Sequence, residues 1–321
     1  MTRSALPDEH IIASAEQRIR PWISETPVLR VPDLDVSFGH PLWLKCENLQ
    51  RTGSFKARGA LNWMLTASEA ELEPGLITIS AGNHAIALAW AAAQKGSPLQ
   101  VVMPKGSSPL KIRLTESLGA RVTVGGTIQE ALAHCHELRD QQGFTLVHPY
   151  NDVRIMAGQG TLGLELLRQQ PDIKRILCPI GGGGLISGLG LAIKGKRPDI
   201  ELIGVEPEGA ATMANAWQHE DASASLATVD TWAASLAPAV VGDYTYEASR
   251  QVVDRILTVS EAAIREATKR LLTEARLYVE PGASVGLAVI IEGGINLADD
   301  VPTALIVTGG NLDLEQVAHC A

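Results

Sequence analysis

Apolar residues along the chain gather in short continuous runs, which alternate with longer segments where they recur every three or four positions. The short runs are typical of buried strands, and the wider spacing is typical of helices that cover a sheet. In the first half, the pattern predicts strands at 41–44, 76–79, 99–103, 121–124 and 144–147, and helices at 8–22, 83–93, 110–118 and from 128 onward. In the second half it predicts helices at 153–169 and 185–194, one capped by Ser260 and one after Pro281, with strands at 175–178, 202–205, 256–257 and 304–307.

Two of the predicted helices carry specific signals. The segment 8–22 has an apolar face made of Ile11, Ile12, Ala15 and Ile19. The helix from 128 opens with Thr127 and Glu130, which have the spacing of a capping box. Its apolar face is predicted to consist of Ile128, Ala131, Leu132, Cys135 and Leu138.

Strands that alternate with helices imply parallel sheets covered on both faces. Folds of this kind bind ligands at the carboxyl ends of their strands. The 321 residues are enough for two such domains, each with its own core. We therefore expect an α/β protein whose functional residues follow its strands.

Charge and cysteine content exclude several classes of protein. The chain has 27 Lys+Arg against 36 Asp+Glu, a net charge of −9, which argues against nucleic acid as a partner. No apolar stretch approaches the ~18 residues of a membrane span, and an N-terminus with Asp8 and Glu9 does not resemble a secretory signal. The cysteines at 46, 135, 178 and 320 lack metal-binding spacing, so we expect buried thiols in a reducing cytoplasm.

A candidate reactive lysine lies at Ser54-Phe55-Lys56, after the strand at 41–44 and a turn at Thr52-Gly53. Ser54 has the character of an N-cap for a helix through Ala57 and Met64, which puts Lys56 in the first helical turn. The positive end of the helix dipole there lowers the pKa of an amine, and lysines tuned in this way form Schiff bases. The tripeptide alone also fits an ordinary surface lysine.

Two further segments join a strand to a helix and suit an anion. The sequence Ser80-Ala81-Gly82-Asn83-His84 allows backbone N–H groups to point at an anion, although an ordinary turn fits it as well. We expect the His84 side chain to be a hydrogen-bonded packing residue rather than a catalyst. The sequence Gly181-Gly182-Gly183-Gly184 suits a cradle of N–H groups around a phosphate, and its spacing is not that of a dinucleotide fold.

Taken together, these segments closely resemble the fold-type II pyridoxal-phosphate (PLP) enzymes, the family of the threonine and serine dehydratases and the serine racemases. The resemblance extends over most of the chain, through Lys111, His148-Pro149, 157–161, 280–283 and Thr308-Gly309-Gly310-Asn311. It implies a tryptophan synthase β-like fold with two parallel or mixed-sheet α/β domains and the cofactor between them. The expected large domain comprises 1–70 plus 151–321, and the expected small domain comprises 71–150.

The resemblance also implies roles for individual residues. Lys56 would hold PLP as a Schiff base beside Phe55 and then act as the base that removes the substrate α-proton. Asn83 would bind the phenolic oxygen of PLP, Thr308 would face its pyridine nitrogen, and 181–184 would hold its phosphate. The substrate carboxylate would be received by Ser80, Ala81, Gly82, Asn83 and His84.

The implied reaction is that of an ammonia-lyase, which removes water from a β-hydroxy amino acid to give a 2-oxo acid and ammonia. L-Threonine or L-serine is the default substrate. Ala233-Ala234-Ser235-Leu236 replaces the usual Ala-Asp-Gly-Leu, and Tyr150-Asn151 replaces Phe-Asp, which leaves room for a related 3-hydroxy amino acid. Ala81 stands where the racemases have a proton-carrying serine, which disfavours an amino-acid racemase. A β-replacement synthase fits the same scaffold, and a phosphate- or nucleotide-binding module without chemistry fits the glycine segment alone.

A divalent cation and a partner subunit also follow only from the resemblance. Glu206 and the Ala210 carbonyl match two ligand positions of the metal-binding relatives, but Thr212 stands in place of their Asp. Because hard cations prefer carboxylate oxygen, the binding of Mg²⁺ or another divalent cation stays open, with Glu208 as a substitute ligand. The usual assembly in the family is a homodimer.

Overall fold

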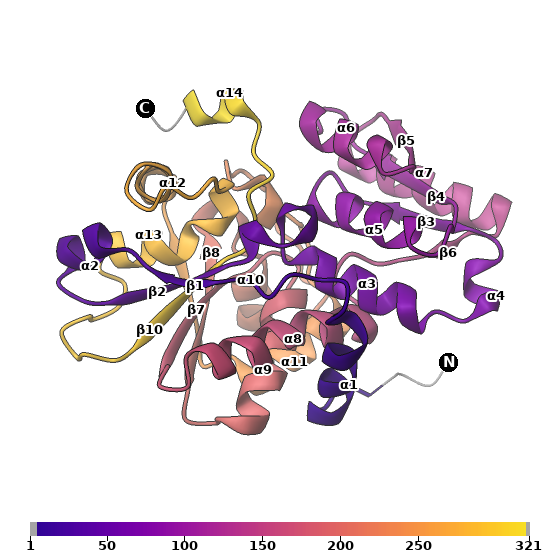
Figure 1. The fold of residues 1–321 in the computed structure, drawn as a ribbon. Coiled ribbons are helices and arrows are strands. Elements are labelled where there is room, and N and C mark those ends of the chain that lie inside the picture. The colour runs from indigo at the N-terminus through magenta and orange to yellow at the C-terminus, as the bar shows by residue number, and fades with distance from the viewer. Residues whose placement is uncertain (1–4, 319–321) are drawn as a thin grey trace.

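The computed structural model describes residues 5–318 and arranges them around two β-sheets (Figure 1). The larger sheet has the strand order β1 (Val28–Arg30), β2 (Leu42–Cys46), β10 (Thr303–Val307), β7 (Arg175–Pro179), β8 (Glu201–Pro207) and β9 (Arg255–Val259). The smaller sheet has the order β5 (Arg121–Val124), β4 (Leu99–Met103), β3 (Leu76–Ile79) and β6 (Thr145–Leu146). Neighbouring strands are parallel except β1 and β2, so the predicted α/β class with parallel and mixed sheets is confirmed.

Helices connect these strands. In the first part of the chain they are α1 (Glu9–Ile19), α2 (Pro32–Phe38), α3 (Lys56–Thr66), α4 (Glu69–Leu72), α5 (Asn83–Ala93), α6 (Pro109–Ser117) and α7 (Ile128–Gln142). In the second part they are α8 (Val153–Gln169), α9 (Gly184–Lys196), α10 (Thr212–His219), α11 (Asp243–Val252), α12 (Glu261–Thr273), α13 (Val285–Ile291) and α14 (Leu314–Val317). The smaller sheet draws its strands from residues 76–146, and the larger sheet draws its strands from both sides of that segment. The predicted domain limits, 1–70 plus 151–321 and 71–150, stay predictions.

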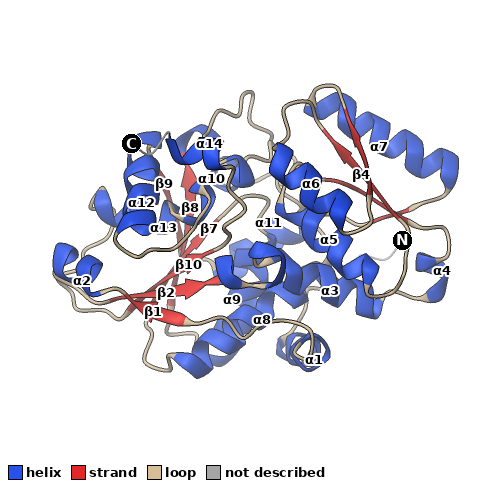
Figure 2. Cartoon of the chain, turned by 45° about the horizontal axis from the view of Figure 1, so that its top comes forward, coloured by secondary structure: helices blue, strands red, loops and turns tan. Residues whose placement is uncertain are grey.

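Each sheet is covered on both faces because its strand residues alternate between two cores. In β10, Leu305 and Val307 pack into one core with α12 and α13, whereas Ala304 and Ile306 pack into another with α8 and α9. Figure 2 shows the strands of the larger sheet between these two pairs of helices. The smaller sheet packs against α5 on one face and against α7 on the other.

Several predicted boundaries and faces are wrong in detail. α1 ends at Ile19 rather than at 22, and Ile11 is 49% exposed, so its buried stripe is narrower than the sequence pattern. The capping box that opens α7 is confirmed, but Ile128 and Leu132 are exposed because α7 contacts the sheet through Ala131 and Cys135. The strand expected at 144–147 is only two residues long.

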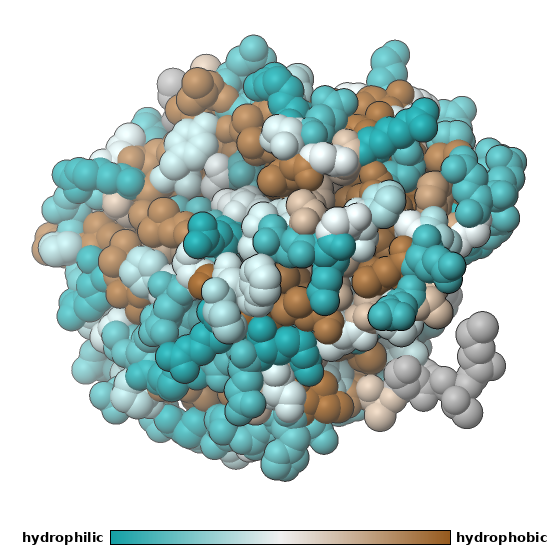
Figure 3. Space-filling model, turned by 45° about the vertical axis from the view of Figure 1, so that its right-hand side comes forward, coloured by the Kyte–Doolittle hydropathy of each residue, from teal (hydrophilic) through white to brown (hydrophobic). Residues whose placement is uncertain are grey.

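The cysteines and the helix lengths test two further predictions from composition. Cys46, Cys135 and Cys178 are free and buried, as expected, and Cys320 lies outside the described residues. Within residues 5–318, no helix is long and apolar enough to cross a membrane. On the face drawn in Figure 3, hydrophobic side chains form separate patches among hydrophilic ones.

Candidate active site

The candidate site forms where loops that follow β2 and β10 are joined. Ser54 and Gly309 form an isolated antiparallel bridge, and the Phe55 N–H donates to the Thr308 carbonyl at 3.1 Å. The Gly310 N–H donates to the Gly53 carbonyl at 2.9 Å. Because β2 and β10 are parallel neighbours, residues about 250 positions apart in sequence meet at their carboxyl ends.

Ser54 does not cap the helix that begins at Lys56, so that prediction is wrong. Ser54 has extended backbone angles (φ −163°, ψ 161°) because it pairs with Gly309, and Phe55 occupies the N-cap position of α3. The buried Ser54 Oγ has no hydrogen-bond partner within the described part of the chain. The hydroxyl two residues before the lysine is therefore a buried polar group without a partner.

Lys56 begins α3 with its amine turned to the loop that precedes α8. Its Nζ donates to the Pro149 carbonyl at 2.7 Å and lies 5.3 Å from the centre of the Phe55 ring. Burial lowers the pKa of Lys56 to about 8, against the opposing effect of Glu280. The direction agrees with the sequence prediction, but burial is its largest cause. The amine is thus primed to act as a nucleophile or base near neutral pH.

Asn83 opens α5 and is fixed by a carboxylate from a distant loop. Its Nδ2 donates to Glu280 Oε1, and its Oδ1 accepts from Asn311 Nδ2 at 2.9 Å. Lys111 Nζ donates to the other Glu280 oxygen at 3.0 Å, and all four residues are buried. Lys111 also approaches the loop before Asn83, since its Nζ is 3.8 Å from an ideal Cβ on Gly82. Glu280 therefore orients the amide that the resemblance assigns to PLP.

Ser80, Ala81 and Gly82 lie between β3 and α5 as predicted, and His84 lies in the first turn of α5. Ser80 Oγ accepts the Gly82 N–H at 3.3 Å, and Ala81 lies between them. His84 is 2% exposed, which agrees with a packing role, but neither ring nitrogen has a hydrogen-bond partner among the described residues. Burial, together with Lys56 and His148, holds the pKa of His84 well below its usual value, so the ring is neutral.

The glycine segment joins β7 to the N-terminus of α9 and leaves no room for side chains. An ideal Cβ on Gly182 would lie 2.3 Å from the Tyr150 ring, one on Gly184 would lie 2.9 Å from Tyr150, and Gly183 has a φ of +88°. The N–H groups of Gly181, Gly182 and Gly183 donate no hydrogen bond to any residue in 5–318. Together with the N-terminus of the thirteen-residue α9, these unpaired N–H groups are donors of the kind that binds anions.

Two loops that the sequence marked as unusual surround this segment. Tyr150 donates from its hydroxyl to the Val240 carbonyl at 2.9 Å, and burial raises its pKa to about 12. The loop 233–236 lies against Gly181, since an ideal Cβ there would be 3.2 Å from Leu236 Cα. The segments 150–151 and 233–236, which differ from the usual family sequence, therefore lie next to the glycine segment.

The predicted metal ligands have other partners. Both Glu206 oxygens accept backbone N–H groups at the start of α10, from Met213 at 2.7 Å and Ala214 at 2.9 Å, and burial raises the pKa of Glu206 to about 7. The Ala210 carbonyl accepts from the Thr212 hydroxyl at 3.4 Å. Residues 5–318 contain no group of three or more His, Cys, Asp or Glu side chains arranged for a metal. These contacts argue against a cation at Glu206 and Ala210, whose binding is untested.

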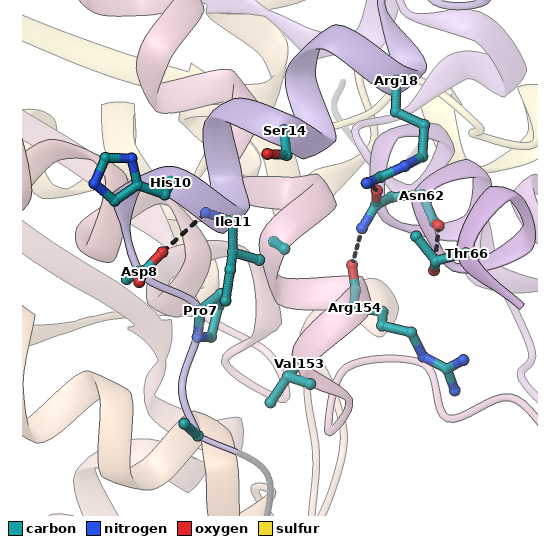
Figure 4. Close-up of a pocket in the computed structure, with 12 residues that line it drawn as sticks. Pro7, Asp8, His10, Ile11, Ser14, Arg18, Asn62, Thr66, Val153 and Arg154 are labelled. Carbon is teal, nitrogen blue, oxygen red and sulfur yellow. Dashed lines mark hydrogen bonds between the residues drawn. The ribbon is translucent and has the colours of Figure 1, made fainter.

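A separate pocket of about 320 Å³ is lined mainly by residues of α1, α3 and α8 (Figure 4). Its lining includes Arg18, which donates to Asn62 at 2.6 Å, and Arg154, whose guanidinium is paired with Glu71. None of the candidate site residues lines this pocket.

A phosphorylated pyridine aldehyde fits the donor set around Lys56 and the glycine segment. The amine with a lowered pKa suits an aldehyde, the unbonded N–H groups of 181–183 suit a phosphate, and Asn83 supplies an oriented amide. Tyr150 lies between the lysine and the glycine segment. It contacts Gly182 and Gly184, and it comes directly after Pro149, whose carbonyl accepts a hydrogen bond from the Lys56 amine. The fold and these residues define a PLP-binding enzyme of fold type II.

The chain belongs to the pyridoxal-phosphate dependent enzyme family, whose model matches residues 19–309. It is 37% identical over 309 residues to an L-threonine ammonia-lyase of Geobacter sulfurreducens, covering 96% of this chain and 76% of the relative. It is 38% identical to a serine racemase of Arabidopsis thaliana, covering 94% of this chain and 92% of the relative. The solved maize serine racemase superposes with a TM-score of 0.92 at 33% identity, covering 98% of this chain and 97% of that one.

The predicted family, fold class and PLP cofactor are thereby confirmed, as is the prediction that the protein is an enzyme. A binding module without chemistry is not supported, because the family is one of enzymes. Sequence reasoning named Lys111, His148 and Glu280 as matching positions but gave them no role. Their contacts link segments far apart in sequence, which no local motif reveals.

Proposed function

We propose that the protein is a PLP-dependent ammonia-lyase that converts a β-hydroxy amino acid into a 2-oxo acid and ammonia. The observation that carries the proposal is the Lys56 amine, which has a pKa of about 8 and a neutral carbonyl as its hydrogen-bond partner. At pH 7.5 about a quarter of such amines are neutral, against about one in a thousand at the ordinary lysine pKa. The L-threonine ammonia-lyase relatives support the same reaction.

Each residue of the candidate site has its own role in the proposed reaction. PLP, when bound, supplies an electron-withdrawing ring that stabilises the negative charge left on the substrate α-carbon. Lys56 Nζ removes the α-proton, which requires its neutral form. The N–H groups at the start of α5 would bind the substrate carboxylate, and those of 181–184 would hold the phosphate. Phe55 lies beside the amine. Thr308 would contribute a hydroxyl to the pyridine nitrogen, and a hydroxyl does not force that nitrogen to be protonated.

Elimination is favoured over racemisation by what stands at position 81. Racemisation needs an acid on the face of the α-carbon opposite the base, and Ala81 carries no proton to give. Because the chain is also similar to serine racemases, racemisation is the main alternative to elimination. A β-replacement synthase would use the same scaffold, and no residue described above favours it.

L-Threonine and L-serine are the default substrates. Asn151 Oδ1 accepts the Tyr244 N–H at 3.0 Å, and Ser235 Oγ lies 2.3 Å from an ideal Cβ on Gly282. These residues differ from the usual ones of the family and lie around the glycine segment. A related 3-hydroxy amino acid should therefore be tested as a substrate alongside L-threonine and L-serine. We further propose that the enzyme acts in the cytoplasm as a homodimer with a small-molecule substrate, and without nucleic-acid or membrane partners. Light scattering tests the dimer.

The decisive experiment compares wild type with Lys56→Ala and Lys56→Arg. Wild-type protein should show a visible absorbance band of bound PLP that shifts when an amino acid is added, and borohydride should fix the cofactor to position 56. Both variants should lack the band and release no 2-oxo acid from a panel of β-hydroxy amino acids. Full turnover by Lys56→Ala, or colourless wild type that takes up no PLP, would refute the proposal.

A further inference from the structure

The turn at 148–151 is built around an imidazole that accepts two backbone N–H groups. His148 Nδ1 accepts from Asn151 at 2.9 Å and from Tyr150 at 3.3 Å. A side chain that accepts N–H groups two and three residues onward has the pattern of an Asx turn, here supplied by histidine. Burial, with Lys56 nearby, lowers the pKa of His148 to about 4, so Nδ1 is an unprotonated acceptor at neutral pH.

Each residue oriented by this turn contacts the candidate site. The Pro149 carbonyl accepts the Lys56 amine at 2.7 Å, the Tyr150 ring fills the space over Gly182, and the Tyr150 Cβ and backbone fill the space over Gly184. The Tyr150 ring also meets the His148 ring edge-on, with centroids 4.6 Å apart. One nitrogen atom therefore sets the turn that touches both the reactive amine and the phosphate-binding glycines.

We propose that His148 is a positioning residue, which acts through Nδ1 to hold 149–151 in the conformation that places Lys56 and supports the glycine segment. This inference rests on the proposed function, because it assigns PLP to Lys56 and the glycines. It goes further by giving a role to a residue that touches neither reacting atom. Without the acceptor, the N–H groups of Tyr150 and Asn151 lose their partner, and the turn gains other conformations.

The test uses two variants that separate the two ring nitrogens. In His148→Asn the amide oxygen occupies the position of Nδ1 and can accept both N–H groups. In His148→Gln the amide is one carbon farther out, near the position of Nε2, and cannot close the turn. Both remove the imidazole and both carry an amide, so a difference between them reports the acceptor at Nδ1.

The first measurement is the equilibrium dissociation constant of PLP, with the rate of borohydride labelling at Lys56. His148→Gln should bind PLP roughly tenfold more weakly than wild type, the loss expected when one or two backbone hydrogen bonds are removed. His148→Asn should recover binding to within about threefold of wild type. Unfolding of both apoproteins in urea shows whether a general loss of stability explains the difference.

The second measurement needs no variant. In apoprotein, amide hydrogen exchange at Tyr150 and Asn151 should be slower than in an open loop, because both N–H groups are bonded. Equal PLP affinity of the Asn and Gln variants, or unprotected amides at both positions, would overturn the inference while wild type still binds PLP. Wild type that binds no PLP would instead refute the proposed function.

Discussion

A buried charge network beneath the Lys56 helix yields a quantitative prediction for Arg58→Met. Arg58 donates to both Glu47 oxygens at 2.8 Å, to Glu165 at 3.0 Å and to Thr161 at 3.3 Å. Lys45 Nζ donates to the other Glu165 oxygen. These two cations and two anions are at most 4% exposed, so their charges balance inside the protein.

Removing Arg58 leaves the network with one negative charge in excess. Glu47 keeps the Thr26 hydroxyl at 2.6 Å as a hydrogen-bond donor, and Glu165 keeps Lys45. Breaking a buried ion pair from one side typically costs about 3–5 kcal/mol, because the remaining charge has lost its partner in a poorly solvated place. That is a large part of the ~5–15 kcal/mol by which proteins are stable.

The second substitution Glu47→Gln restores the charge balance of the network. The double variant should therefore be more stable than Arg58→Met alone, with a coupling energy of about 1–3 kcal/mol. The assay is urea unfolding of the apoprotein, followed by tryptophan fluorescence. Arg139→Met is the matched control, because Arg139 pairs with Asp140 at the surface and its loss should cost less than about 1 kcal/mol. Equal losses for Arg58→Met and Arg139→Met, or strict additivity in the double variant, would refute the reasoning.

The glycine segment, Glu206 and His148 each have a measurable consequence for binding or stability. Gly182→Ala should weaken PLP binding by about 5- to 150-fold, measured by titration, because its Cβ would lie 2.3 Å from the Tyr150 ring and overpacking costs about 1–3 kcal/mol. In the control Gly125→Ala the added Cβ meets no atom within 4 Å, so this variant should bind PLP normally. Removing divalent cations with EDTA should leave the melting temperature and activity unchanged, because both Glu206 oxygens hold backbone N–H groups; a loss that Mg²⁺ restores would contradict this. Stability should fall as pH drops from about 6.5 to 4, by up to ~3 kcal/mol from His148, because the unfolded chain takes up its proton first, and His148→Asn should flatten that part of the unfolding profile.

The sequence predicts the parts of the fold that depend on local pattern. The strands other than β1 and the helix from 153 to 169 were predictable because apolar runs and helical spacing report burial directly. The three-residue β1 was missed, because so short a segment has no readable pattern. The glycine segment was predictable because glycines between apolar elements have few other uses. The sequence pattern did not predict how wide the buried face of α7 is. Ile128 and Leu132 are exposed, because the width of a buried face depends on how much of the sheet the helix covers.

Residues of the site that depend on long-range pairing were beyond such reasoning. A serine before a helix is a good N-cap by local rules, but Ser54 pairs with Gly309 instead. The Glu280 carboxylate orients Asn83 from 197 positions away in the sequence. No spacing rule connects such residues, because their proximity exists only after the two sheets have formed.

The contrast between Arg58 and Lys56 explains how two neighbouring cations on one helix serve different ends. Both are drawn out of water, which disfavours their charge. Although burial opposes it, Glu47 and Glu165 hold the pKa of Arg58 above its ordinary value, so Arg58 keeps its charge and anchors α3. The Lys56 amine donates a hydrogen bond to the Pro149 carbonyl, which carries no charge to offset the effect of burial. The protonated amine therefore loses its proton more easily. A carboxylate placed at position 149 or 150 should therefore raise the Lys56 pKa and slow proton removal from substrate, even if PLP binding were unchanged.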